Sequence, residues 1–258
     1  MFLRLRQICF VAEDLASVEN DLVAVLGLSP CHRDPRIASF GLENVLMPVG
    51  PSSFFEIVSP IAAGTTAGRY LERRSGDGGY MAIFDSDELD RWREHIAVNG
   101  VREAALLEFD GFTSLQMHPR DTGGPLLEIN CTVGGADVLG NYGPAGSHWQ
   151  KQVRMSRVQG LLGVEIQSEN PEKLARRWAT ILMRDEPVPF EGEWHVTVDN
   201  AVLRFVGTGD ERGEGLRGID LEVHDTAPIL DAAHRRKLAM EGSMVCIGGV
   251  RCYLHNRK

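Results

Sequence analysis

The feature that most constrains the fold of this chain is an internal repeat of one short order of elements. A strand leads into an acidic or Asx helix cap, then a helix with apolar residues at helical spacing, then further short strands. The order starts four times, near Leu3, Tyr80, Leu161 and Gly218. Each unit needs a neighbour to bury its apolar face, so a repeat must be recognised before any fold is named. The sequence therefore predicts an α+β fold built from four tandem βαβββ units.

The boundaries of the repeat predict how the chain is divided. Residues 1–133 would form one domain of two βαβββ units, and residues 155–258 a second, degenerate one. Residues 134–154 are rich in glycine and predict a linker between them. We expect a curved mixed sheet in each domain, with the helices outside.

Single elements follow from the local pattern. In the first unit, the sequence predicts a helix over 15–26 and strands over 37–41, 44–48 and 53–60. Residues 119–125 read as a polar hairpin turn between two apolar runs. The helices of the later units are expected over 88–98, 172–183 and 228–240.

Composition excludes several classes of partner. The net charge is −9 and no basic stripe occurs, which disfavours nucleic acid and anionic membranes. No apolar run approaches the roughly 20 residues that span a bilayer, and the N-terminus lacks the pattern of a signal peptide. The five cysteines are odd in number and share no metal-like spacing, which favours buried thiols in a reducing compartment. We expect a cytoplasmic protein.

Two glutamates lie inside apolar strands. Glu128 falls in the second apolar run of residues 112–131, and Glu56 falls in residues 53–60. A carboxylate is costly to bury unless it is paired or metal-bound, although a glutamate on the solvent face of a half-buried strand is the ordinary alternative. Two such strands at equivalent places in successive units favour a site.

The repeat resembles the vicinal oxygen chelate superfamily, which includes glyoxalase I, bleomycin-resistance proteins, extradiol dioxygenases and methylmalonyl-CoA epimerase. The local segment His118-Pro119-Arg120-Asp121-Thr122-Gly123-Gly124, leading to Glu128, is similar to the His-Pro-Lys-Asp…Gly…Glu segment of the epimerases. The resemblance implies that two units form a half-open barrel around a divalent metal, with ligands on the first and last strand of each unit.

Carried onto this chain, the resemblance implies the metal ligands Gln7, Glu56 and Glu128. The fourth place falls on Met81, or on Tyr80 if the strand is counted differently, and neither side chain offers a nitrogen ligand. Oxygen ligands alone would suit Mg²⁺ or Mn²⁺ better than Zn²⁺ or Ni²⁺, and a relic site without metal is the alternative. His118 is a candidate for the missing nitrogen or for a substrate contact.

The implied activity is that of a glyoxalase- or epimerase-like protein, which moves a proton on a small carbonyl or acyl substrate. Glu128, Glu56 and His118 are the catalytic candidates, and Arg120, Tyr80 and Trp149 the substrate-binding ones, with an anionic substrate as one possibility. The alternative is a non-enzymatic binding protein of the bleomycin-resistance kind. The second half holds Gly163, Arg204, Gly218 and Tyr253 at the corresponding places, so no metal site is expected there. The sequence leaves oligomer formation open.

Overall fold

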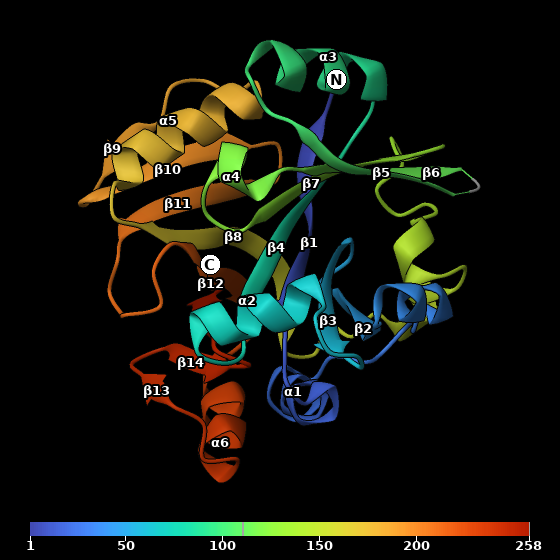
Figure 1. The fold of residues 1–258 in the computed structure, drawn as a ribbon. Helices are drawn as coiled ribbons and strands as arrows, with labels where there is room; N and C mark the ends of the chain where they lie inside the picture. Colours follow the sequence, from blue (N-terminus) through green and yellow to red (C-terminus); the bar gives the residue numbers. More distant parts are fainter. Residues whose placement is uncertain (110, 258) are drawn as a thin grey trace.

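The computed structural model describes residues 1–109 and 111–257, which form two mixed β-sheets with helices around them (Figure 1). The seven strands of the first sheet come from residues 3–132, and the eight strands of the second come from residues 158–256. The predicted α+β fold with a repeated βαβββ order is therefore confirmed.

The first sheet has the strand order β2-β3-β1-β4-β7-β6-β5. Antiparallel strands β1 and β4 lie at its centre, and each carries the last strand of its own unit as a parallel neighbour. The two units are thus related by an approximate twofold axis between β1 and β4. The strands of the first sheet are β1 (Leu3–Val11), β2 (Leu42–Val49), β3 (Ser53–Pro60), β4 (Gly78–Ser86), β5 (Glu103–Phe109), β6 (Phe112–Met117) and β7 (Leu126–Thr132).

The second sheet repeats this plan in the order β13-β14-β15-β12-β8-β11-β10-β9. Strands β8 and β12 are the central antiparallel pair, with β11 and β15 as their parallel neighbours. Its strands are β8 (Val158–Ser168), β9 (Val188–Phe190), β10 (Glu193–Val198), β11 (Ala201–Gly207), β12 (Gly215–Val223), β13 (Met240–Glu241), β14 (Met244–Ile247) and β15 (Val250–Asn256).

The expected side-chain caps are present in the first and third units, at Asp14 and Asn170, whereas the acidic cap expected in the second unit is wrong, because Glu88 precedes α3 without a side-chain cap hydrogen bond. Asp14, Thr65 and Asn170 each accept a hydrogen bond from a backbone N–H in the first turn of the following helix. The α-helices are α1 (Leu15–Asp21, continued by a π-helical turn over Leu22–Leu26), α2 (Thr66–Arg74), α3 (Leu89–Val98), α4 (Pro119–Thr122), α5 (Pro171–Ile181) and α6 (Ala227–Arg235). None of the helices in the described ranges has the length and apolarity that a membrane crossing requires.

Two predictions of element type were wrong, and the helix expected over 228–240 ends at Arg235. Residues 37–41 are not a strand but part of a 3₁₀ helix over Pro35–Phe40, because Asp34 caps it and Pro35 favours its first turn. Residues 119–125 are not a simple turn: His118 caps the short helix α4, and Gly123 and Gly124 then adopt positive φ to lead the chain into β7.

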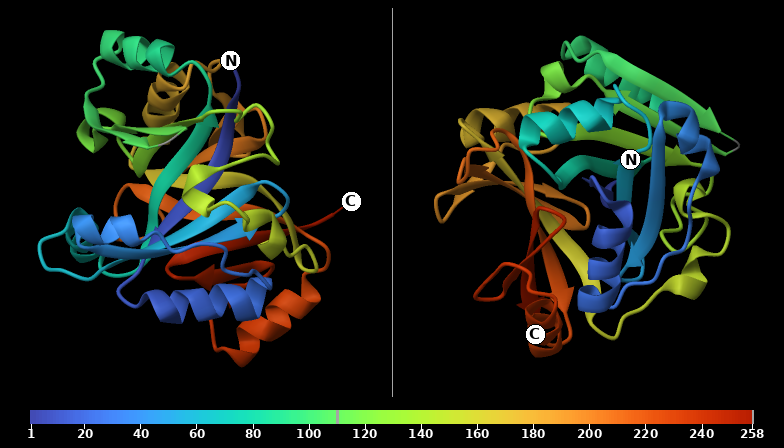
Figure 2. Two further views of the ribbon diagram at one scale, coloured as in Figure 1. Left: turned by 90° about the vertical axis from the view of Figure 1, so that its right-hand side faces the viewer. Right: turned by 60° about the horizontal axis from the view of Figure 1, so that its bottom comes forward.

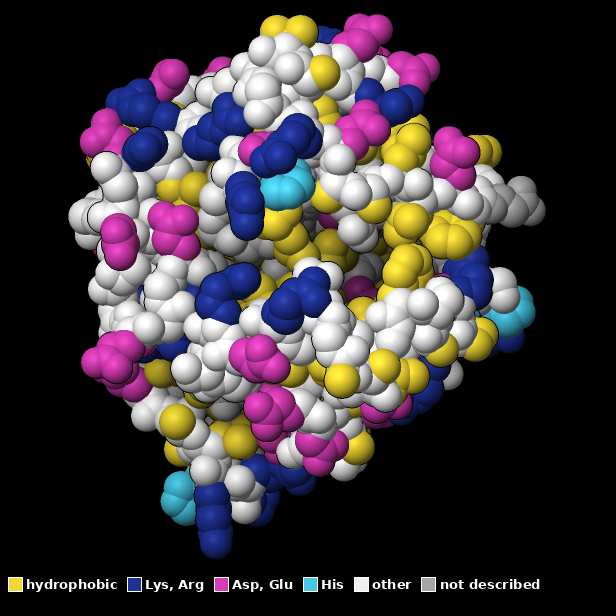
Figure 3. All heavy atoms as spheres, in the orientation of Figure 1, with side chains coloured by type: hydrophobic (Ala, Val, Ile, Leu, Met, Phe, Trp, Pro, Cys, Tyr) yellow, Lys and Arg dark blue, Asp and Glu magenta, His cyan; other side chains and the backbone are white. Residues whose placement is uncertain are grey.

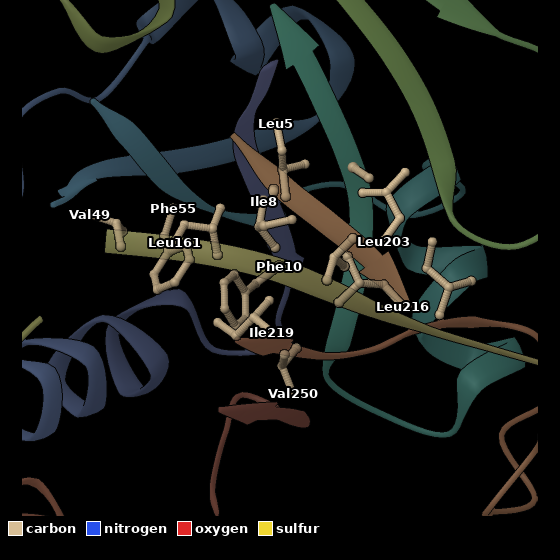
Figure 4. Close-up of a cluster of buried hydrophobic side chains, with 14 of the residues drawn as sticks. Leu5, Ile8, Phe10, Val49, Phe55, Leu161, Leu203, Leu216, Ile219 and Val250 are labelled. Atoms are coloured by element: carbon tan, nitrogen blue, oxygen red, sulfur yellow. The ribbon is translucent and has the colours of Figure 1, made fainter. Parts of the chain in front are cut away.

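The two sheets pack against each other through one shared hydrophobic core. Figure 4 shows Ile8, Phe10 and Phe55 of the first sheet facing Leu161 and Ile219 of the second. Side chains of α1, α3, α5 and α6 extend the same core. The opposite face of each sheet points away from the core, and the face of the first sheet carries the glutamates singled out above.

The segment between the sheets runs over the edge of the first sheet (Figure 2). It contains two 3₁₀ turns, Gly143–Ala145 and Trp149–Gln152. Its aromatic residues Tyr142 and Trp149 are buried against Phe54 of β3. The segment therefore belongs to the packing around the first sheet.

Candidate active site

Strand register places the predicted ligand positions in equivalent places of the first two units. Cys9 of β1 pairs with Glu56 of β3, and Ile83 of β4 pairs with Glu128 of β7. Gln7 and Met81 each precede these paired residues by two positions, on the same face. Met81, not Tyr80, is thus the counterpart of Gln7. Tyr80 has no partner residue on β1, since the pairing of β4 with β1 passes from Met81 directly to Gly79.

These residues line one cavity of about 620 Å³. Gln7, Glu56 and Glu128 all border it, as do Tyr80 and Met81. Figure 3 shows the hollow on this face, bordered by hydrophobic side chains with acidic atoms at depth. A volume of this size is typical of pockets for small organic molecules.

Glu56 is held by two side-chain amides. Asn44 Nδ2 donates to Oε1 and Gln7 Nε2 donates to Oε2, both at 2.7 Å. Loss of hydration raises the pKa of Glu56 to about 7, the nearby charge of Glu128 adds to this, and the amide hydrogen bonds oppose it. A carboxyl group with this pKa exchanges its proton readily near neutrality.

Glu128 lies deeper in the cavity, with 6% of its surface exposed. Gln116 Nε2 on the neighbouring strand β6 donates to Oε2 at 2.9 Å. Burial raises the pKa of Glu128, while Ser114, Gln116 and Asn130 beside it favour the charged form. Ser114 and Asn130 also line the cavity beside Glu128.

The remaining polar contacts form a chain behind Gln7. Asn130 Nδ2 donates to the hydroxyl of Tyr142 at 3.2 Å, and this hydroxyl donates to Gln7 Oε1 at 3.0 Å. Gln7 therefore presents its amide nitrogen, not its oxygen, to Glu56. The nearby thiol of Cys9 is no nucleophile, because burial raises its pKa well above the ordinary value.

The residues at the four places do not fit a divalent metal. The carbonyl oxygen of Gln7 is taken by Tyr142, and the amide nitrogen beside Glu56 is a donor and cannot coordinate a cation. Met81 offers a soft thioether where a hard cation would need oxygen or nitrogen. No group of three His, Cys, Asp or Glu side chains suited to a metal occurs in residues 1–109 and 111–257.

The other sequence candidates lie at the border of the site or outside it. His118 is the N-cap of α4, where Nδ1 accepts from the backbone N–H of Arg120, and Arg120 is exposed. Neither side chain borders the cavity, whereas Pro119 between them does. Trp149 is buried behind Phe54 and donates its indole N–H to the carbonyl of Gly140. The positions of His118, Arg120 and Trp149 do not support direct contact with a ligand in this cavity.

Sequence reasoning missed five polar residues that surround the glutamates. They are Asn44, Ser114, Gln116, Asn130 and Tyr142. Alternation along the strands would have found Ser114, Gln116 and Asn130, which share the face of Glu128. Tyr142 had no such signal, because it comes from the irregular segment between the sheets.

The walls of the cavity are mainly apolar. Phe40, Phe109 and Phe112 lie along them, together with Ile37, Leu42, Leu46, Val58, Ile83, Leu107 and Leu126. Arg36 is the one cation among the described lining residues, and it forms a two-pronged ion pair with Asp34, with N–O distances of 2.7 and 2.8 Å. The charge of Arg36 is thus already neutralised.

Comparison with known proteins supports the fold. No family model and no curated protein matches the chain. A hypothetical protein from Staphylococcus aureus superposes with a TM-score of 0.68 at 12% identity, covering 100% of both chains. A mutant of 4-hydroxymandelate synthase from Streptomyces coelicolor gives 0.63 at 14% identity, covering 91% of this chain and 75% of the other.

A smaller structure matches half of the chain. Methylmalonyl-CoA epimerase from Streptomyces coelicolor, in complex with 2-nitronate-propionyl-CoA, has a TM-score of 0.46 at 18% identity. The match covers 51% of this chain and 99% of the epimerase. Together with the strand order and register of both sheets, the likenesses to these two larger structures show the fold, a fourfold repeat of the βαβββ kind in one polypeptide, which is the architecture that the resemblance to the vicinal oxygen chelate superfamily implied.

Proposed function

We propose that the cavity of the first sheet binds a small carbonyl or acyl compound and moves a proton on it without a metal. The observation that carries this proposal is the pair Glu56 and Glu128, two carboxyl groups with raised pKa in one cavity. Groups of this kind serve as general acid and base near neutral pH.

The two glutamates are assigned different roles. Glu56 holds its proton near neutral pH, because loss of hydration and the charge of Glu128 raise its pKa to about 7. Glu128 is therefore the base that takes a proton from the carbon next to the carbonyl. Glu56 in its protonated form gives its proton to the carbonyl oxygen, so an enol forms and the charge of the pair moves from Glu128 to Glu56. Glu128 then returns a proton to the carbon while the enol O–H gives its proton back to Glu56, which restores the carbonyl group and both glutamates.

The lining favours a substrate without negative charge. Three carboxyl groups line the cavity, and Arg36, the one cation among its described lining residues, is paired with Asp34, so an anion would be repelled. The apolar walls suit a hydrocarbon or aromatic body. This differs from the anionic substrate considered from sequence, because the exposed Arg120 lies outside the lining.

Hydrogen–deuterium exchange tests the proposal. Phenylacetone, an uncharged aryl ketone, would be incubated in D₂O with chelator-treated protein, and loss of its α-proton signals would be followed by NMR. We expect exchange faster than in buffer alone, and a loss of about 10²- to 10⁴-fold in Glu128→Gln and in Glu56→Gln. Glu103→Gln on β5 is the control, because this glutamate lies outside the cavity. Exchange that is equal in protein and buffer would contradict the proposal.

Binding without turnover is the second candidate function. It is favoured by the apolar cavity and by the absence of a fitting metal set among the described residues. Saturable binding of phenylacetone that is unaccompanied by exchange would establish this function in place of the enzymatic one.

A further inference from the structure

The hydroxyl of Tyr142 lies between the polar floor of the cavity and the back of Gln7. We propose that Tyr142 is a positioning residue: it fixes Gln7 as a hydrogen-bond donor to Glu56 and thereby excludes divalent cations from the cavity. The inference rests on the proposed function in that it explains how the same two glutamates can work without a metal.

The direction of the hydrogen bonds fixes the orientation of Gln7. Gln7 Nε2 lies 2.7 Å from Glu56 Oε2 and donates to it. The oxygen end lies 3.0 Å from the Tyr142 hydroxyl, which has a single proton to give. Asn130 Nδ2 donates to the same hydroxyl, so that proton is directed to Gln7. The chain Asn130, Tyr142, Gln7, Glu56 therefore runs in one direction.

Packing holds Tyr142 in this position. Its side chain is almost fully buried, with 1% of its surface exposed. The ring stacks on Phe54 with 4.8 Å between the centroids, and the guanidinium of Arg6 lies 4.9 Å from the ring centroid. Burial raises the pKa of the Tyr142 hydroxyl well above its usual value, so the group stays a donor. Gln7 cannot turn its oxygen toward the cavity without losing this bond.

The consequence is a difference in metal affinity that mutation can reveal. In Met81→His, the new histidine would occupy the fourth ligand position beside the two glutamates. Gln7 would still present N–H groups to the same space. Removing the hydroxyl in Met81→His/Tyr142→Phe frees the amide to turn and to offer its oxygen. Residues that orient a metal ligand typically change metal affinity by about 10- to 100-fold.

Zinc affinity, measured by competition with a chromogenic chelator, tests the inference. We expect Met81→His/Tyr142→Phe to bind Zn²⁺ about 10- to 100-fold more tightly than Met81→His. The matched control is Met81→His/Tyr70→Phe, which also removes a buried hydroxyl, one that donates to the carbonyl of Gly79. A purely structural role of Tyr142 would give the same affinity in all three variants.

A second variant tests the inference if Met81→His/Tyr142→Phe does not fold. In Gln7→Glu/Met81→His, a carboxylate replaces the amide, so one oxygen accepts from Tyr142 while the other faces the metal. We expect this variant also to bind Zn²⁺ more tightly than Met81→His. Equal affinity of Met81→His and Gln7→Glu/Met81→His would overturn the inference. Zinc binding does not depend on proton exchange, so this result is distinguishable from a failure of the exchange test.

Discussion

Arg204 of the second sheet occupies the register position that Glu56 occupies in the first. Glu56 pairs with Cys9, and Arg204 pairs with Glu165 at the corresponding place on the parallel neighbour. Its guanidinium forms ion pairs with Glu165, Glu193 and Asp220 at 2.8–3.2 Å. Where the first sheet has an acidic cavity, the second sheet therefore has an internal cation.

Removing this cation should destabilise the second sheet. Arg204→Met would remove the cation that Glu165 and Asp220 share and leave them only Arg217, Tyr253 and His255 as partners, and we expect a loss of about 3 kcal/mol in the free energy of unfolding. Urea denaturation measures it. Arg176→Met, in an exposed ion pair with Glu172, is the control and should cost at most about 1 kcal/mol. Equal losses in both variants would show that the network adds no stability.

The raised pKa of Glu56 should make stability fall as pH rises. The folded carboxyl group titrates at about 7 and an unperturbed one at 4.5, so the folded state binds more protons between these values. The contribution is complete below about pH 4.5 and is lost through pH 7, and 2.5 pKa units correspond to roughly 3 kcal/mol.

Thermal unfolding between pH 5 and 8 checks this prediction. The melting temperature of Glu56→Gln should fall less steeply with pH than that of the unmodified protein, because the variant has no carboxyl group to titrate at this position. Identical slopes in the two proteins would mean that Glu56 titrates normally in the folded state.

The close contact of Gly79 on β4 with Leu216 on β12 should be sensitive to one methyl group. A Cβ at Gly79 would lie 2.2 Å from Leu216 Cδ2, so Gly79→Ala should cost about 1–3 kcal/mol. In Gly79→Ala/Leu216→Ala the second change makes room for the methyl group. The double variant should lose less stability than the sum of the two single losses, and strict additivity would argue against the contact.

Trp149 should contribute to stability and not to ligand binding. Its ring packs edge-on against Phe54, with 5.0 Å between the centroids, so Trp149→Ala should lower the free energy of unfolding by about 3–5 kcal/mol. Trp149→Phe keeps most of this packing and should bind phenylacetone as the unmodified protein does. A large loss of affinity for phenylacetone in Trp149→Phe, with stability retained, would show that Trp149 contributes to ligand binding.

Most of the fold could be predicted from the sequence, because short-range sequence patterns determine most of its helices and strands. Caps such as Asp14 and Asn170, and apolar alternation along the strands, identify each unit locally. The first unit departs from the pattern, since a 3₁₀ helix and a single bridge from His32 to Leu46 take the place of its first outer strand. Asp34 and Pro35 favour that turn over the β-propensity of the residues after it.

The site was predicted less completely, for a physical reason. Gln7, Glu56 and Glu128 follow from strand positions, and all three border the cavity. The direction in which the Gln7 amide points depends on Tyr142, which lies 135 residues away in the chain. No local pattern encodes such a contact, and the same holds for the burial of Trp149.

The single core between the sheets also governs how this chain can change over generations. Substitutions on either outward face leave the packing of Phe10, Phe55 and Ile219 untouched. One half can therefore exchange an acidic cavity for an arginine network while it still supplies the apolar partner that its twin needs to fold. With both sheets in one chain, the shared core maintains the architecture, and the outward face of each sheet can vary without the other.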